Sequence, residues 1–111
     1  MTLIATLSFR EADKAKFRTY ERKASAIMAN HGGRIEHAYF GWDEEAKVCK
    51  EAHVARFPDE AAFEAYRNDQ ALRDLAAERA ECVLETRILI CKEEVEYGGS
   101  QNGEHAVRRS Q

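Results

Sequence analysis

The sequence is poor in proline, with Pro58 as its one example, and no long hydrophobic run interrupts it. A membrane-spanning helix needs roughly 20 consecutive apolar residues, which no stretch of this chain approaches. The apolar segment 2–9 lacks the basic start of a signal peptide and soon meets Arg10 and Glu11. We therefore expect no membrane association and no export.

Cysteine is also scarce, and the three present are Cys49, Cys82 and Cys91. Their number is odd and no CxxC occurs, which argues against a disulfide framework and against a zinc knuckle. Reduced thiols and a cytoplasmic location are the expectation. The histidines form no HxH or HxxxH pair, so we expect no metal site. No P-loop, GxGxxG or GxSxG motif is present, and no cofactor is predicted.

A basic excess is missing as well, because the net charge is -3. Nucleic-acid binding normally needs a basic surface, so we expect none. The 111 residues, 44% hydrophobic and 33% charged, are typical of one globular domain with a modest core. We place that domain at residues 1–97. The polar, glycine-rich stretch 98–111 is predicted to be a flexible tail.

The segment Glu51–Ala80 has the clearest local signals for secondary structure. A strand ends at Pro58, which cannot donate a backbone hydrogen bond, and Asp59 is suited to cap the helix that follows. Asn68 and Asp69 offer a second cap, which indicates that the helix is broken there. The second helical segment carries a stripe at helical spacing, which consists of Leu72, Leu75, Ala76 and Arg79.

The remaining elements follow from periodicity. Residues 2–9 alternate as a strand, and residues 11–31 repeat apolar side chains as a long helix that ends before Gly32. Residues 34–42 and 47–57 read as two strands of a hairpin, and residues 82–91 as a last strand. The order β-α-β-β-α-β predicts an α+β fold of the ferredoxin-like type, with helices on one face of a four-stranded antiparallel sheet.

The second face of that sheet would remain uncovered. On the first and last strands it would carry Ile4, Val83 and Leu89 among polar neighbours. This mixture is too apolar for a face that meets only water, and it suits contact between two copies of the chain. We therefore expect a homodimer through the open sheet face.

These residues also carry a resemblance to a known family. The segment EAHVARFPDEAAFEAYRND, the following LRDLAAER and the closing strand VLETRILI resemble the dimeric α+β barrel superfamily, and within it short bacterial domains of unknown function. The resemblance covers residues 1–95 and implies a homodimer with sheets packed face to face. The superfamily includes cofactor-independent monooxygenases and isomerases, but no catalytic motif of these enzymes is matched here.

Two histidines are the candidate catalytic residues, because His37 and His53 each fall in the middle of a predicted strand. A histidine that faces a pocket could act as a general base near neutral pH. The alternative is a hydrogen-bonded, partly buried imidazole without a catalytic role. Whether the two histidines share a face depends on the hairpin register, since a slip of one residue exchanges the faces.

The candidate substrate-binding residues are Arg56, which could orient an anionic substrate, and three aromatic residues that could line a pocket: Tyr39, Trp42 and Tyr66. The same aromatic residues would equally serve a core or a dimer interface.

Three functions are consistent with these patterns. The first is a homodimer that binds a small organic molecule between sheet and helices, with no assigned reaction. The second is a cofactor-free monooxygenase or an isomerase that uses a strand histidine as base. The third is a structural or interaction module without enzymatic activity.

Overall fold

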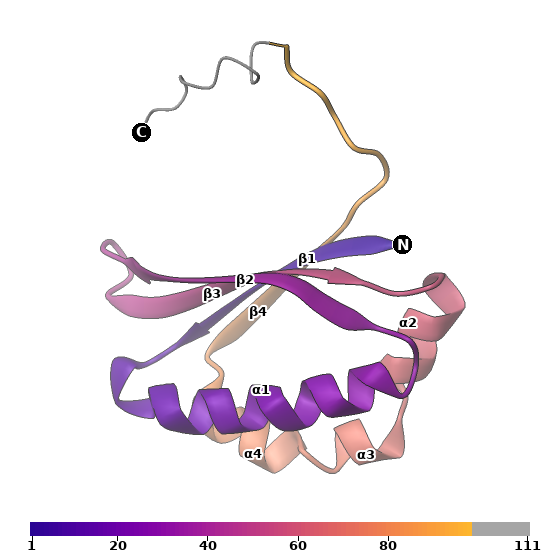
Figure 1. Ribbon diagram of the computed structural model, residues 1–111. Coiled ribbons are helices and arrows are strands. Elements are labelled where there is room, and N and C mark those ends of the chain that lie inside the picture. Colours follow the sequence, from indigo (N-terminus) through magenta and orange to yellow (C-terminus); the bar gives the residue numbers. More distant parts are fainter. Residues whose placement is uncertain (99–111) are drawn as a thin grey trace.

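The computed structural model describes residues 1–98. One four-stranded antiparallel sheet has the strand order β2-β3-β1-β4 (Figure 1). The elements, in chain order, are β1 (Thr2–Phe9), a short 3-10 turn (Glu11–Asp13), α1 (Lys14–Ala29), β2 (Arg34–Asp43), β3 (Val48–Arg56), α2 (Glu60–Arg67), α3 (Gln70–Arg73), α4 (Ala76–Cys82) and β4 (Glu85–Ile90).

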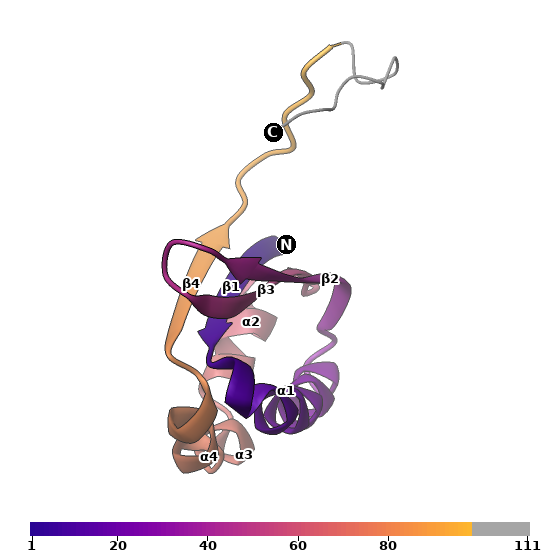
Figure 2. The same ribbon diagram turned by 90° about the vertical axis from the view of Figure 1, so that its left-hand side faces the viewer.

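All four α-helices cover the same face of the sheet, and the opposite face is open in both views (Figures 1 and 2). This arrangement confirms the predicted ferredoxin-like α+β fold. Within residues 1–98, no helix has the length and apolar character that crossing a membrane requires. Apart from Gly98, the predicted tail at 98–111 lies outside the described residues.

The helix α1 follows the predicted apolar stripe, and its buried residues are Phe17, Tyr20, Ala24 and Met28. After the helix, Gly32 adopts the left-handed conformation with φ 74°, which glycine adopts without strain. Gly33 is required for a different reason. A Cβ at this position would overlap the Phe57 ring and lie 2.6 Å from Cγ of Met28.

The junction between β3 and α2 also forms as predicted. The Asp59 side chain accepts a hydrogen bond of 2.8 Å from the backbone N–H of Ala62, which caps the helix. Phe57, the residue before Pro58, contacts Phe63 with 5.3 Å between ring centroids. The cap and this aromatic contact together set the direction in which α2 leaves the sheet.

The start of the last strand was predicted too early. Cys82 is the last residue of α4 and Val83 is its C-cap, whose backbone N–H still bonds to the carbonyl of Arg79 at 2.8 Å. Val83 packs against the buried cluster around Cys82 instead of lying on the open face. The strand itself begins at Glu85. Leu89 does lie exposed on that face, opposite Ile4.

A bulge in β2 decides the relation between the two strand histidines. Ile35 pairs with Ala55, but the next pair is His37 with Val54, so Glu36 is an extra residue. Without the bulge, His37 would have paired directly with His53. With it, Ala38 is the partner of His53, and the two histidines face opposite sides of the sheet.

The core between sheet and helices consists of two clusters. One contains the stacked rings of Phe9 and Phe17, whose centroids are 4.0 Å apart, together with the buried thiols of Cys49 and Cys82. The other gathers Leu3, Met28, Ala55, Phe57 and Phe63. Side chains of both clusters border a cavity, which therefore lies between them.

Candidate functional site

The cavity has a volume of about 180 Å³ and lies between the helical layer and the sheet. Most of its lining is apolar, and a few polar side chains converge on it. Ligand sites commonly combine these two features. Two of the lining residues, Arg67 and Ile88, are also exposed, which indicates that the cavity reaches the surface. The polar or ionisable lining residues are Tyr20, Glu21, His53, Tyr66, Arg67, Arg79 and Thr86.

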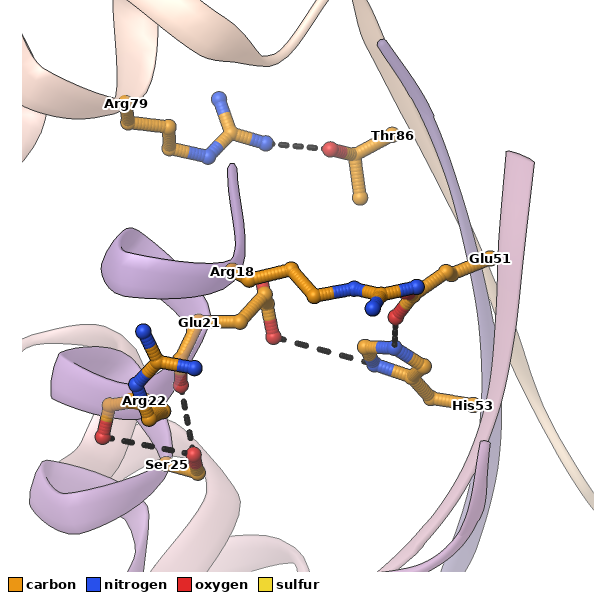
Figure 3. A network of polar contacts seen from close by, with 8 residues as sticks. All are labelled: Arg18, Glu21, Arg22, Ser25, Glu51, His53, Arg79 and Thr86. Carbon is orange, nitrogen blue, oxygen red and sulfur yellow. Dashed lines mark hydrogen bonds and ion pairs between the residues drawn. The ribbon is translucent and has the colours of Figure 1, made fainter. Parts of the chain in front are cut away.

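His53 and Tyr20 are the most buried of these residues, each at 5% exposure. Strand β3 holds His53 on the helix-covered face, opposite Ala5 of β1. Its Nε2 lies 2.9 Å from Oε1 of Glu51, and its Nδ1 lies 3.8 Å from Oε1 of Glu21 on α1 (Figure 3). The imidazole therefore sits between two carboxylates.

The partner on the Nε2 side is itself held in place. Arg18 of α1 binds the second carboxylate oxygen of Glu51, with 3.2 Å between Nε and Oε2 (Figure 3). With the Glu51 carboxylate as acceptor, the proton of this contact is assigned to Nε2 of His53. In the neutral ring, Nδ1 is then the basic nitrogen.

Glu21 stands on the Nδ1 side of the ring and is largely removed from water. Burial raises the pKa of the Glu21 carboxyl above its usual value, and the nearby His53 opposes part of that effect. A carboxyl group with a raised pKa beside a basic nitrogen can exchange protons with it or with a ligand.

Arg79 approaches the cavity from α4, on the side opposite His53 in the close view (Figure 3). Its guanidinium donates a hydrogen bond to the hydroxyl of Thr86 on β4. It also lies beside Tyr20. Burial raises the pKa of the Tyr20 phenol, and the charge of Arg79 offsets this increase only in part.

Two residues of the sequence-predicted site meet in this cavity, His53 and Tyr66. Burial also raises the pKa of the Tyr66 phenol. His37 and Tyr39 lie elsewhere, since they stack on each other in β2 with ring centroids 6.3 Å apart and the rings inclined by 16°. Both are exposed, and they face away from the helices.

Arg56 and Trp42 do not border the cavity either. Arg56 is exposed near the end of β3, where its Nε contacts Oε1 of Glu36 at 2.8 Å. Trp42 is half exposed near the hairpin and donates a hydrogen bond of 3.0 Å from Nε1 to Oε1 of Glu44. The structure thus does not bring these two residues to His53.

Sequence reasoning missed Glu21 and Arg79 as site residues. Arg79 left a signal, because it occupies an otherwise apolar stripe with Leu72 and Leu75. An arginine on the buried stripe of a helix needs a polar environment, and here that environment is the cavity. The sequence indicates Glu21 less clearly. It follows the buried Tyr20, but the helix has many other charged residues from which the sequence alone does not distinguish it.

The described residues do not assemble a metal centre. Within 1–98, no three histidine, cysteine, aspartate or glutamate side chains are arranged to hold a metal ion.

No protein-family model matches the sequence, and no curated protein matches it. Solved structures do match. SnoaB, a cofactor-independent oxygenase from Streptomyces nogalater, superposes with a TM-score of 0.59 at 12% identity, over 86% of this chain and 96% of that one. RPA0582 from Rhodopseudomonas palustris, a protein of unknown function, gives a TM-score of 0.69 at 17% identity, over 86% and 83%.

A NIPSNAP domain protein from Burkholderia xenovorans adds a third match, with a TM-score of 0.61 at 9% identity over 86% of this chain and 98% of that one. The chain shares with these structures the ferredoxin-like α+β barrel fold. At such low identity the likeness extends to the fold alone, so the activity of an α+β barrel has to be argued from its own site.

Proposed function

We propose that this α+β barrel protein binds a small, largely apolar organic molecule in the cavity beside His53. The supporting observation is the combination of apolar walls with a few buried polar groups whose positions are set by other side chains. An engineered cavity of about 150 Å³ binds benzene, so about 180 Å³ suits a single ring or a short branched chain. A buried polar group such as His53 would then fix the orientation of the ligand.

The test uses small aromatic probes, namely phenol, benzyl alcohol and indole, followed through the ring nitrogen resonances of His53 by NMR. Binding in the cavity should shift these resonances. Ala24→Leu fills part of the cavity and should weaken the shift, whereas Ala26→Leu on the exposed side of α1 should not. Equal responses in both variants, or no response to any probe at millimolar concentration, would contradict ligand binding in this cavity.

A second candidate function is proton transfer, as in a cofactor-free monooxygenase or an isomerase. The contact of His53 with Glu51 favours it, because a carboxylate on Nε2 orients the ring and stabilises the protonated imidazole. Nδ1 would remove a proton from a carbon or hydroxyl group of the substrate. An isomerase would return that proton at another carbon.

Deuterium exchange tests this chemistry without a known substrate. Small unsaturated ketones and lactones are incubated with the protein in D₂O, and exchange at their acidic C–H positions is followed by NMR. The wild-type protein should accelerate exchange for at least one compound, and His53→Gln should abolish the acceleration. His37→Gln is the matched control and should keep it, since His37 lies on the other face. If His53→Gln were as active as the wild type, the mechanism would be excluded.

The proposal includes a homodimer formed through the open sheet face, in the cytoplasm. The open face exposes Tyr39 at 64%, Leu89 at 62% and Ile4 at 36%, and large exposed apolar side chains are typical of interfaces. The three free thiols agree with a reducing compartment. Sedimentation equilibrium should give a dimer for the wild type and for Ala80→Glu on α4, but a monomer for Leu89→Glu. A folded wild-type monomer at high concentration would refute the dimer.

A further inference from the structure

The guanidinium of Arg79 borders the cavity, and no carboxylate within residues 1–98 forms an ion pair with it. Its hydrogen bond goes to the hydroxyl of Thr86, a neutral group. Among residues 1–98, no carboxylate oxygen lies within 4.0 Å of its nitrogens. Glu21 is near enough to feel its charge, but it makes no ion pair with it. A partly buried positive charge is thus held beside the cavity by neutral groups.

Six of the other arginines within residues 1–98 pair with a carboxylate, whereas the exposed Arg22 and Arg73 contact neutral oxygens of Thr19 and Asn68. Arg67, which also borders the cavity, pairs with Glu64 at 3.4 Å. On the strands, Arg56 pairs with Glu36 at 2.8 Å and Arg87 with Glu85 at 2.9 Å. These three are exposed and need a counter-charge least. Arg79 is half-buried and would gain most from one, because water stabilises its charge less.

We infer that the ligand of the cavity is a small organic acid whose carboxylate binds to Arg79, with its apolar body against the walls of the cavity. This inference rests on the proposed function. A guanidinium matches a carboxylate with two parallel hydrogen bonds, and such charge-assisted bonds are the stronger ones in proteins. The hydroxyl of Thr86 stands at the same place to add a further hydrogen bond.

The position of Arg79 also sets the orientation of the acid. Arg79 comes from α4 and His53 from β3, and the close view shows them on different sides of the site (Figure 3). With its carboxylate at Arg79, the ligand would direct its other end toward His53. Glu21 would not oppose binding strongly, because burial already raises the pKa of its carboxyl and a second anion favours the protonated form further.

The experiment compares acids with the amides of the same shape: benzoate with benzamide, phenylacetate with phenylacetamide, and hexanoate with hexanamide. Binding at pH 7 is measured by ligand-observed NMR and calorimetry. The acid should bind more tightly than its amide, by roughly 10- to 100-fold, because hydrogen bonds to charged groups are worth more than neutral ones. Arg79→Gln should remove this preference and leave the binding of the amide in place.

Two more variants make the comparison specific. Arg79→Lys keeps the charge but not the planar fork, so part of the preference for the acid should remain, and it controls for a folding defect in Arg79→Gln. Arg67→Gln removes the other arginine of the cavity, which is already paired, and should leave the preference unchanged.

The outcomes separate the two proposals. If amides bind as tightly as acids to the wild type, or if the preference for acids survives in Arg79→Gln, the inference about Arg79 is wrong while ligand binding in the cavity stands. If neither acids nor amides bind, both proposals fall.

Discussion

Nε2 of His53 lies 2.9 Å from Oε1 of Glu51, two residues earlier on the same strand and the same face of the sheet. Both residues belong to β3, so the contact between them is local in the sequence. The side chains around this contact come from a distant segment. Arg18 of α1 anchors the far side of Glu51, and Glu21 of the same helix faces Nδ1. One helix and one strand thus define the polar centre of the cavity.

The first prediction concerns this contact. Glu51→Ala leaves the buried imidazole without its acceptor, and an unsatisfied buried polar group costs about 1–3 kcal/mol. We expect the free energy of unfolding, measured with urea, to fall by that amount. Glu64→Ala is the control. It removes an exposed partner of Arg67 and should change the free energy of unfolding by less than about 0.5 kcal/mol. Equal losses in the two variants would mean that His53 does not depend on Glu51.

The second prediction concerns the buried carboxyl of Glu21, whose pKa is raised above the usual 4.5 by burial. In the pH range between the unfolded and the folded pKa, the native state binds more protons than the unfolded state, so stability decreases as the pH rises through that range. Glu21→Gln should therefore be more stable than the wild type at pH 7. The difference should disappear below about pH 4.5, where Glu21 is neutral in both states.

Urea unfolding of both proteins at a series of pH values measures this difference. Glu45→Gln, an exposed position in the β2–β3 hairpin, is the control and should track the wild type at every pH. A Glu21→Gln variant that is less stable than the wild type at neutral pH would show that the ionised carboxylate contributes favourably.

The third prediction concerns Asp69, whose pKa is lowered and not raised, so that its ionised form stabilises the fold. Asp69 binds Nε2 of His31 at 2.7 Å and also caps α3 through the N–H of Ala71. The hydrogen bond from His31 lowers the pKa of Asp69 below 3.8, and the cap adds to this effect. The ionised carboxylate of Asp69 makes its full contribution to the free energy of unfolding above pH 3.8. This contribution is lost as the pH falls through the pKa that Asp69 has in the folded state.

Asp69→Ala should consequently lower the urea midpoint of unfolding at pH 7. The difference in midpoint between this variant and the wild type should become smaller as the pH falls below 3.8. His31→Ala isolates the part that comes from the histidine, since the cap on Ala71 remains. If the difference in urea midpoint stayed constant from pH 7 to pH 2.5, the ionised Asp69 carboxylate would not contribute to stability.

The fourth prediction uses two glycines. Gly33→Ala would place a Cβ against the Phe57 ring and Met28, and overpacking of this kind costs about 1–3 kcal/mol. At Gly41, near the end of β2, a Cβ would meet no atom within 4 Å. Gly41→Ala should be neutral or stabilising by up to about 1 kcal/mol. Thermal unfolding measures both, and a neutral Gly33→Ala would show that the turn can shift.

Local signals account for what the sequence could predict. Asp59 and Asp69 cap backbone N–H groups that follow them closely in the chain, and Gly32 acts through its own left-handed backbone. These effects are local, so they can be predicted without knowing distant partners. The element order then followed, and it determined the fold. The end of α4 was misplaced because Cys82 suits a helix as well as a strand.

The site depended on contacts that periodicity does not encode. The bulge at Glu36 turns His37 away from the helices, although both strand histidines have the same sequence pattern. Arg79 reaches the cavity because α4 packs beside α1, where its guanidinium contacts Thr86 of β4, and this is a tertiary relation that periodicity does not encode. Arg56 was chosen as an anion-binding residue, but its neighbour Glu36 already neutralises it.

A crystal structure with the tightest-binding acid of the panel would decide whether this cavity is the ligand site. We expect the molecule inside the cavity, with its carboxylate on Arg79 and its apolar body against Phe57 and Phe63. A ligand bound only at the surface, with the space beside His53 empty or filled by side chains, would contradict that claim.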